Sequence, residues 1–490
     1  MDTLTPYLIG ISALLVLSVV ASKGAGRFGI PALSIFLVLG ILVGKGGPGG
    51  VAFSNYSVAQ TLGILALVCI LHAGGRSTPW SDIWAVRGSG LVLSTAGTVI
   101  ATALVGWFSI RFLHFDALSG FLLGATVAST DVAAVFTVLR SRHASLKGRI
   151  RPLLEIESAL NDPMAVFLSV GVLQLITRPG QASWPSLVPM FFEQMILGVL
   201  AGVLAGHATR WIMNRVRLEF EGLYPALSVG LVVLTYGLTQ KCGGSGFLAV
   251  YISGIVLGNA NYVHKLNLSV FHDGLAWLMQ IAMFLTMGLL VLPRELAGVA
   301  ASGVALSAFL ALVARPVSVM LCLTPFRFSW REQLMVSWAG LRGAVPIVLA
   351  TYPLLAGAPG AKTIFNLVFF VVFTSVLIQA TMIPLVARWL KVAAPLATPF
   401  RYPIQYNPTT SLKNELVEIP VPPDSTIIGR ALADLALPTG ALIVLIRRKD
   451  DAFVPSGTTR IDAGDTLLVL AEQDALARLR AIVGEASPQA

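Results

Sequence analysis

Four ionisable residues lie near the middle of long apolar stretches and are the groups most able to do chemistry: Asp131, Glu157, Asp162 and Arg342. A charged side chain is costly at the centre of a bilayer, so such residues usually face a partner or a water-filled cavity and serve a function. Carboxylates with nearby hydroxyl or carbonyl oxygens are hard ligands, which suit a small cation. The two aspartates therefore mark a candidate ion site.

The two aspartates fall on consecutive apolar segments, which run in opposite directions, so both can lie at mid-membrane depth. Ser158 lies four residues before Asp162 and shares its helical face, and Thr130 directly precedes Asp131. Asn161, beside Asp162, either joins the site or forms a hydrogen bond between helices. Two neighbouring carboxylates are unfavourable there without a bound cation or proton. Competition of a monovalent cation and a proton for Asp131 and Asp162, with alternating access, gives exchange.

Glu157 is expected to point away from this site. It is five residues from Asp162, about 140° around a helix. An unpaired guanidinium would be costly at the depth of Arg342, so the sequence predicts a structural ion pair between Glu157 and Arg342. Gly343 weakens the helix beside Arg342 and can leave peptide groups free to face an ion. Arg315, nearer the end of its segment, is interpreted as a local partner.

Composition indicates that the elements positioning these residues are membrane helices. Of 490 residues, 56% are hydrophobic and 12% are charged, whereas soluble proteins carry about 25% charged residues. A helix needs about 20 mostly apolar residues to cross a bilayer. This rule predicts an all-α polytopic membrane protein with about thirteen spans, at approximately 4–22, 28–44, 57–75, 88–112, 117–140, 152–177, 187–214, 222–240, 243–260, 271–292, 296–323, 332–355 and 363–390.

Charge in the loops predicts the orientation. Fifteen Lys and Arg residues follow odd-numbered spans and six follow even-numbered spans. The positive-inside rule then places the N-terminus in the periplasm and the C-terminus in the cytoplasm, in the inner membrane of a bacterium. The basic residues are loop anchors, so nucleic acid is not an expected partner. Thirteen spans also permit two sets of six around a linking span, related as inverted repeats, because segments seven apart run in opposite directions.

Composition changes past residue 395. We assign residues 1–394 to the transmembrane domain, 395–410 to a linker rich in Pro and polar residues, and 411–490 to a small α+β cytoplasmic domain. Apolar patterns there predict strands at 416–421, 441–446 and 466–471, helices at 427–435 and 474–483, and a polar turn at 447–451. A domain of this size has little core, so docking or pairing with a second copy is expected.

The motifs in the membrane part resemble those of the NhaP-type cation/proton antiporters of the sodium/hydrogen exchanger superfamily, over roughly residues 5–392. They are Thr130-Asp131, Glu157-Ser158 with Asn161-Asp162, and Gly340-Leu341-Arg342-Gly343-Ala344-Val345-Pro346. The resemblance implies that the ion and proton bind at Asp131, Thr130, Ser158 and Asp162, with Asn161 beside them. It also implies that Glu157 and Arg342 brace the core.

The same resemblance implies crossed, partly unwound fifth and twelfth spans, a homodimer and an elevator-like motion. Asn161, where some relatives have a second aspartate, indicates electroneutral one-for-one exchange. Pro163 departs from the glycine expected after Asp162 and is expected to alter the local helix geometry.

The C-terminal domain resembles the TrkA-C (RCK-C) ligand-sensing module, through Asp424–Leu435 and Gly464–Leu470. The resemblance implies an unidentified small-molecule or nucleotide ligand. The combination resembles potassium/proton antiporters, which implies exchange of cytoplasmic potassium, and of sodium or rubidium in addition, for external protons. No cofactor and no enzymatic activity are expected. A sodium/proton antiporter is the alternative.

Two functions of other classes also fit a polytopic protein with intramembrane aspartates. A regulated cation channel predicts a carbonyl-lined filter, and the sequence has no stretch like Thr-Val-Gly-Tyr-Gly. An intramembrane aspartyl protease predicts Gly-x-Gly-Asp, whereas Asn161 and Pro163 flank Asp162. Proton-coupled cation flux in vesicles distinguishes an antiporter from both a channel and a protease.

Overall fold

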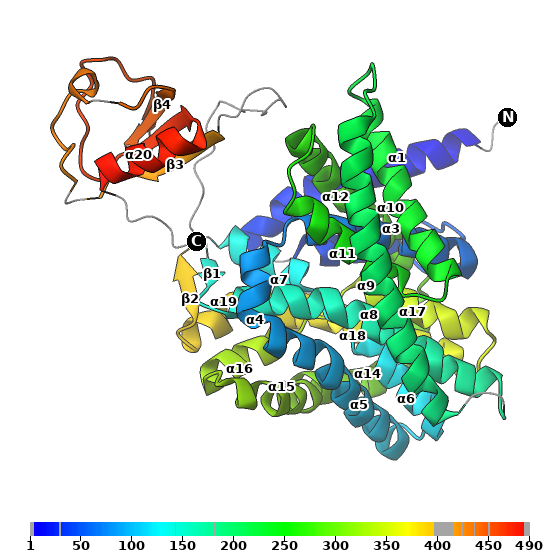
Figure 1. Cartoon of the computed structure of the whole chain (residues 1–490). Coiled ribbons are helices and arrows are strands. Elements are labelled where there is room, and N and C mark those ends of the chain that lie inside the picture. Colours follow the sequence, from blue (N-terminus) through cyan, green and yellow to red (C-terminus); the bar gives the residue numbers. More distant parts are fainter. Residues whose placement is uncertain are drawn as a thin grey trace. The chain divides into compact units, whose positions relative to one another are not determined.

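The computed structural model describes residues 4–28, 31–142, 144–180, 183–395, 415–422, 425–435, 437–448 and 451–484 (Figure 1). The chain divides into two compact units, Met1–Ala397 and Thr398–Ala490. The first unit is built from the α-helices α1 (Leu4–Phe28), α2 (Ala32–Val43), α3 (Tyr56–Arg76), α4 (Trp80–Val92), α5 (Thr98–Phe112), α6 (Ala117–Val127), α7 (Val132–Ser141), α8 (Ile150–Thr177), α9 (Trp184–Arg215), α10 (Leu223–Lys241), α11 (Gly246–Gly258), α12 (Lys265–Leu289), α13 (Pro293–Gly298), α14 (Ala300–Phe309), α15 (Arg315–Leu323), α16 (Trp330–Trp338), α17 (Ala344–Leu355), α18 (Ala361–Thr374) and α19 (Ala380–Trp389).

Short irregular turns join several of these helices into longer rods. The π-helical segments η1 (Leu93–Gly97), η2 (Leu310–Ala314) and η4 (Ser375–Gln379) connect α4 to α5, α14 to α15 and α18 to α19, and the 3₁₀ turn η3 (Thr324–Phe326) follows α15. Within the described residues, nine helical stretches are long and apolar enough to cross a membrane, and four shorter apolar helices accompany them. They coincide with the thirteen predicted segments, so the predicted polytopic helical fold is confirmed.

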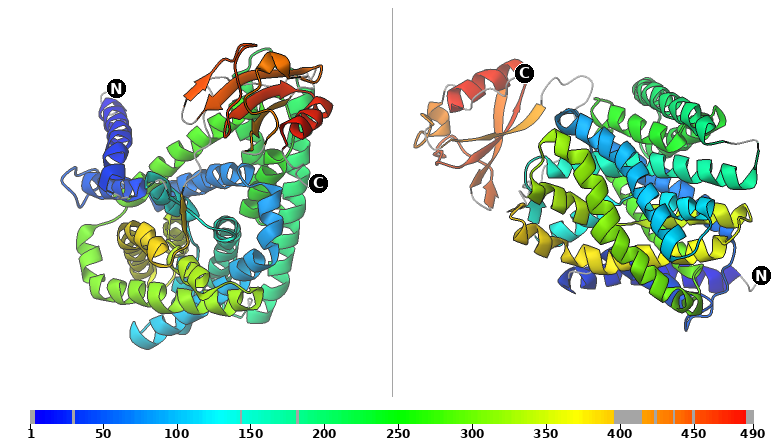
Figure 2. Two further views of the ribbon diagram at one scale, coloured as in Figure 1. Left: turned by 90° about the vertical axis from the view of Figure 1, so that its left-hand side faces the viewer. Right: turned by 90° about the horizontal axis from the view of Figure 1, so that it is seen from below.

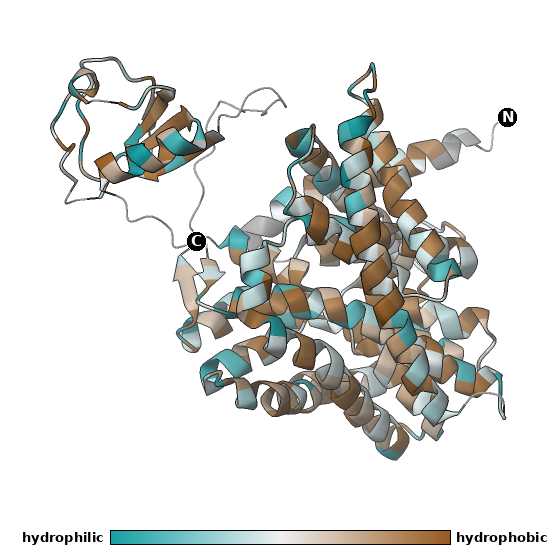
Figure 3. Cartoon of the chain, in the orientation of Figure 1, coloured by the Kyte–Doolittle hydropathy of each residue, from teal (hydrophilic) through white to brown (hydrophobic). Residues whose placement is uncertain are grey.

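Exposed apolar side chains identify the surface that faces lipid. On α9, Phe192, Leu204 and Trp211 are all more than half exposed. Figure 3 shows hydrophobic residues along the outward side of this and neighbouring helices. A soluble protein rarely exposes such a continuous apolar surface, and hydrocarbon is the medium that it suits.

Small residues set the spacing between helices. The helix α2 packs on α12, and α3 packs on both α11 and α12. A Cβ atom on Gly40 would lie 2.4 Å from the Leu285 carbonyl oxygen, and one on Gly288 would lie 2.5 Å from that of Leu37. Side chains that small let membrane helices approach at backbone distance. The long α9, which runs along the helical unit (Figure 2), packs on α11 in the same way through glycines four residues apart.

The second unit is a four-stranded antiparallel sheet of order β3-β6-β4-β5 with one helix. Its elements are β3 (Glu415–Pro420), β4 (Ala441–Arg448), β5 (Asp451–Phe453), β6 (Thr466–Ala471) and α20 (Gln473–Val483). Val469, Leu479 and Val483 belong to its buried core. The three predicted strands, the last helix and the α+β class are confirmed, and β5 was not predicted.

The predicted helix at 427–435 is wrong. The segment forms a turn and one 3₁₀ turn, η5 (Leu432–Asp434). Gly429 takes a φ of 81°, and the Gly429 and Leu432 N–H groups donate to the carbonyls of Ile461 and Thr459 at 2.8 and 3.0 Å. Pairing with a distant segment therefore overrides local helix propensity, which is a weak determinant.

A two-stranded antiparallel sheet also escaped prediction. Strand β1 (Ala144–Leu146) lies between α7 and α8, and β2 (Ala393–Pro395) follows α19. Ser145 stands opposite Ala394, and the Lys147 N–H donates to the Val392 carbonyl at 2.9 Å. Pro395, the first residue of the predicted linker, thus belongs to a strand. Residues 396–410 of that linker lie outside the described residues.

Candidate functional site

The fifth and twelfth membrane segments are each interrupted. Ala128–Asp131 separates α6 from α7, and Ala339–Gly343 separates α16 from α17. The Asp131 N–H donates to the Leu341 carbonyl at 2.7 Å, so the two interruptions lie against each other. The crossing of partly unwound fifth and twelfth spans is confirmed. It matters because every helix end in a membrane exposes peptide groups that need partners.

Glycine at position 343 makes this close contact possible. A Cβ atom there would lie 2.4 Å from the Asp131 Oδ2 and 2.6 Å from the Asp131 Cβ. Turning the Asp131 carboxylate would relieve the first contact and leave the second. Asp131 itself is the N-cap of α7, and its Oδ1 accepts hydrogen bonds from the Ala133 and Ala134 N–H groups at 2.9 and 3.4 Å. Its charge therefore also faces the positive end of the α7 dipole.

Arg342 does not pair with Glu157, and that prediction is wrong. Its Nη1 donates to the carbonyls of Ala128 and Ser129 at 2.6 and 2.7 Å, and its backbone N–H donates to the Ser375 hydroxyl. Arg342 is 2% exposed. A cation at a helix C-terminus satisfies carbonyls that have no helical partner and opposes the helix dipole. Arg342 therefore closes the end of α6 at the first interruption.

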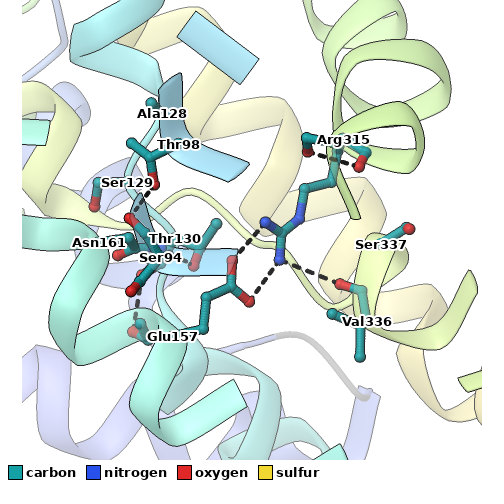
Figure 4. A network of polar contacts seen from close by, with 12 residues as sticks. Ser94, Thr98, Ala128, Ser129, Thr130, Glu157, Asn161, Arg315, Val336 and Ser337 are labelled. Carbon is teal, nitrogen blue, oxygen red and sulfur yellow. Dashed lines mark hydrogen bonds and ion pairs between the residues drawn. The ribbon is translucent and has the colours of Figure 1, made fainter. Parts of the chain in front are cut away.

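Glu157 instead forms a buried ion pair with Arg315 of α15 (Figure 4). The Arg315 Nη1 and Nη2 donate to the two carboxylate oxygens at 2.5 and 2.7 Å, a bidentate geometry. The Glu157 side chain is 2% exposed and the Arg315 side chain is 5% exposed. Glu157 faces away from Asp162, as its position on the helix predicts, and it braces α8 against α15.

Asp162 of α8 lies against the first interruption, at whose end Asp131 caps α7. The Ser129 hydroxyl donates a hydrogen bond to Asp162 Oδ1. Ser129 and Asp162 are both buried, whereas Asp131 is partly exposed. The structure thus places both aspartates at the interruption of the fifth span, and their joint role as an ion site stays a prediction.

Oxygens of α8 and of the first interruption surround the two carboxylates. The Ser158 hydroxyl donates to the Thr130 carbonyl at 2.8 Å and accepts from the Val132 N–H at 3.3 Å. The Asn161 Nδ2 donates to the Thr130 hydroxyl at 2.6 Å, so Asn161 joins α8 to the first interruption. The Asn161 Oδ1 is buried and has no hydrogen-bond partner. An acceptor left free beside two carboxylates is suited to a cation.

Sequence reasoning missed two residues of this arrangement. Ser129 carried a signal, because it stands two residues before Asp131 in the same polar run, Ser129-Thr130-Asp131. Arg315 was interpreted only as a local partner, because nothing in the sequence places α15 beside α8. Within the described residues no group of three or more His, Cys, Asp and Glu side chains is arranged to hold a metal ion. The two aspartates are the acidic side chains of this candidate site.

Apolar spanning helices, with two interrupted spans that face each other beside paired carboxylates, define a secondary transporter with ion binding at discontinuous helices. Residues 11–389 match the family model "Sodium/hydrogen exchanger, transmembrane", and residues 416–484 match the TrkA-C domain. The chain belongs to the sodium/hydrogen exchanger family.

Relatives with assigned activities cover almost all of the chain. It is 39% identical over 485 residues to the K⁺/H⁺ antiporter NhaP2 of Shewanella baltica, covering 98% of this chain and 83% of the relative. It is 36% identical to the K⁺/H⁺ antiporter NhaP of Alkalimonas amylolytica over 96% of this chain and 82% of the relative. The sodium proton antiporter MjNhaP1 of Methanocaldococcus jannaschii shares the fold, with a TM-score of 0.69 and 24% identity, over 79% of this chain and 99% of the neighbour.

We predict that Glu157→Ala and Arg315→Ala each destabilise the protein by about 3–5 kcal/mol, because each leaves a buried charge unpaired. The double variant Glu157→Ala/Arg315→Ala should lose much less stability than the sum of the two single losses, as measured by thermal unfolding. Glu157→Ala/Arg342→Ala is the matched control. Additive losses for Glu157 and Arg315, with recovery for Glu157 and Arg342, would contradict the observed pairing.

We predict that Gly343→Ala abolishes transport while the protein remains folded, because the added methyl group separates the crossing or displaces Asp131. Gly237→Ala on α10 is the control, since a Cβ atom there meets nothing within 4 Å. Cation-driven proton flux in vesicles, normalised to the amount of folded protein, measures both. Full activity of Gly343→Ala would show that the crossing accommodates a side chain.

Proposed function

We propose that this chain is a K⁺/H⁺ antiporter that exchanges cytoplasmic potassium for external protons at Asp131 and Asp162, one for one. The observation that carries the proposal is the crossing of the two interrupted helices, with both carboxylates beside it. Relatives at 36–39% identity that carry the name K⁺/H⁺ antiporter support the choice of potassium. The chain is then a transporter and not an enzyme.

In the proposed mechanism, a cation and a proton compete for the same two carboxylates. The Ser158 hydroxyl, the Thr130 carbonyl and the Asn161 Oδ1 supply neutral oxygens, so Thr130, Ser158 and Asn161 complete the cation shell. A dehydrated cation needs such oxygens in place of water. A proton on Asp162 removes the charge that attracts the cation, and release of that proton restores it.

Charge balance supports one-for-one exchange. Glu157 is neutralised by Arg315, and Arg342 is held by the carbonyls at the end of α6. The charges free to vary are then those of Asp131 and Asp162. Asn161 adds none, so replacement of one proton by one monovalent cation leaves the charge of the site unchanged.

Sodium/proton exchange is the second candidate. A relative named probable Na⁺/H⁺ antiporter 2 of Methanocaldococcus jannaschii is 27% identical over 356 residues, 68% of this chain. The two carboxylates and neutral oxygens can bind either ion by their chemistry alone.

We further propose a homodimer in a bacterial inner membrane, with a periplasmic N-terminus and a cytoplasmic C-terminal domain, as the loop charges indicate.

We also propose that the C-terminal domain regulates exchange through the strand pair β1–β2. Strand β1 joins α7, which begins after Asp131, to α8, which carries Asp162. Strand β2 is the last described element before the chain continues to the C-terminal domain. A ligand of that domain would therefore act on the connection between the two helices that carry the carboxylates. Such a ligand must bind the two arrangements with different affinity to shift their balance.

We predict that Asp162→Asn abolishes cation-driven proton movement, because the site can no longer exchange a proton for a cation. Everted vesicles with a pH-sensitive dye, given potassium, sodium, rubidium and lithium separately, provide the measurement. Asp116→Asn is the control, since Asp116 is an exposed helix cap outside the site. Wild-type exchange by Asp162→Asn would overturn the assignment, and a response to sodium without potassium would favour the second candidate.

We predict that removal of residues from Ser411 onward changes the pH or potassium dependence of exchange without abolishing it. Ala394→Pro, which disrupts the pairing of β2 with β1, should reproduce the effect, and truncation should add nothing to it. Ala394→Val, which favours a strand, should behave as wild type. A further change on truncating Ala394→Pro, or no effect of truncation in the wild type, would contradict regulation through the strand pair.

A further inference from the structure

A cavity of about 240 Å³ lies between α14–η2 and α18–η4. Gly340 and Arg342, from the interruption between α16 and α17, also line it. It is separate from the oxygens that surround Asp131 and Asp162. No element of the transport mechanism described above uses it.

The walls of this cavity have almost no free hydrogen-bond donors or acceptors for a water molecule. The Ser307 and Thr374 hydroxyls hydrogen-bond to each other at 2.9 Å. The Ser375 hydroxyl donates to Gln379 Oε1, and Gln379 Nε2 donates to the Trp338 carbonyl, both at 2.9 Å. These hydroxyl and amide side chains are thus satisfied within the lining, Arg315 and Arg342 bind partners outside it, and the rest of the lining is mostly apolar.

Arg315 Nε is an exception, since it is buried without a hydrogen-bond partner. Gly340 lies against it, and a Cβ atom at position 340 would come within 2.4 Å of that nitrogen. A buried water needs about two to four polar partners, and one shielded donor does not provide them. The cavity is therefore suited to an apolar occupant.

The rim of the cavity identifies that occupant. Val304, Leu312 and Ile378 line it and are 57%, 64% and 56% exposed. Leu312 and Ile378 lie in the central parts of the membrane spans Ala300–Phe326 and Ala361–Trp389, and Val304 lies nearer the start of the first span. Hydrocarbon is the medium at the middle of a bilayer, and an empty apolar cavity of about 150 Å³ is already large enough for benzene.

We propose that this cavity binds the end of a lipid acyl chain, which enters from the bilayer and packs against Gly340 and Arg342. Arg342 holds the carbonyls of Ala128 and Ser129, and the Ser129 hydroxyl contacts Asp162. The bound chain therefore supports the side of Arg342 away from the ion site. Two of the walls are the π-helical segments η2 and η4, a distortion that is frequent at functional sites.

Tryptophan fluorescence tests the site directly, because Trp338 lines the cavity. The full-length protein is reconstituted in phosphatidylcholine brominated near the ends of its acyl chains, since bromine quenches a tryptophan that it contacts. The emission of Trp338 is the difference between the wild type and Trp338→Phe. We expect strong quenching in the wild type and weak quenching in Ala308→Phe, in which a phenyl ring fills the cavity.

Ala305→Phe is the matched control, because Ala305 is exposed on the same helix and outside the cavity. It should behave as the wild type. Equal quenching of Trp338 in Ala308→Phe and Ala305→Phe would overturn the proposal. Absence of quenching in the wild type would also overturn it, since the cavity is then empty or covered by protein.

Thermal unfolding gives a second readout. Adding phosphatidylcholine back to delipidated protein should raise the Tm of the wild type and of Ala305→Phe, because a ligand of the folded state stabilises it. In Ala308→Phe, whose cavity is already filled, the rise in Tm should be no more than about half of the rise in the wild type. The same rise in all three proteins would contradict binding in this cavity.

Discussion

The hydrogen bond from the Asp131 N–H to the Leu341 carbonyl joins two helices that each stop partway through the membrane. In hydrocarbon, a broken helix persists only where its free peptide groups find partners within the protein. Here the carboxylate of Asp131 caps one half-helix, and the guanidinium of Arg342 binds the carbonyls that end another. Gly343 leaves the space in which the two interruptions meet. The proposed ion site depends on this contact, because the contact satisfies interrupted helices that the bilayer otherwise disfavours.

The division of charge follows from the same constraint. One buried arginine neutralises a buried glutamate, and the other binds only neutral carbonyls. A buried charge without either kind of partner would destabilise the fold by several kcal/mol. The two aspartates are consequently the intramembrane acids of the described site that no basic side chain pairs with. In the proposed function, cations and protons supply that missing positive charge.

One short connection in the chain links the two helices that carry the carboxylates. The helices α7 and α8 follow one another, so the short connection containing β1 is common to both carboxylate-bearing elements. Pairing of β1 with β2 brings a segment from nearly 250 positions later in the chain to that connection. The proposed regulation through this strand pair would therefore act on both carboxylate-bearing helices at once.

Much of this protein was determined by the sequence alone, because a bilayer imposes simple requirements. Apolar segments of sufficient length predicted the spans, and the motifs around Asp131, Asp162 and Gly343 predicted the interrupted helices and the residues that meet there. The cost of a buried charge also led to the prediction that Glu157 pairs with Arg342, which was wrong in the choice of arginine. Only the tertiary structure decided which arginine: Arg315 and Arg342 are equally suited by type, and the packing of α15 on the core brings Arg315 to Glu157. The strand pair β1–β2 and the loop at 427–435 were undetermined for the same reason, since their partners lie far away in the sequence and local propensity does not identify them.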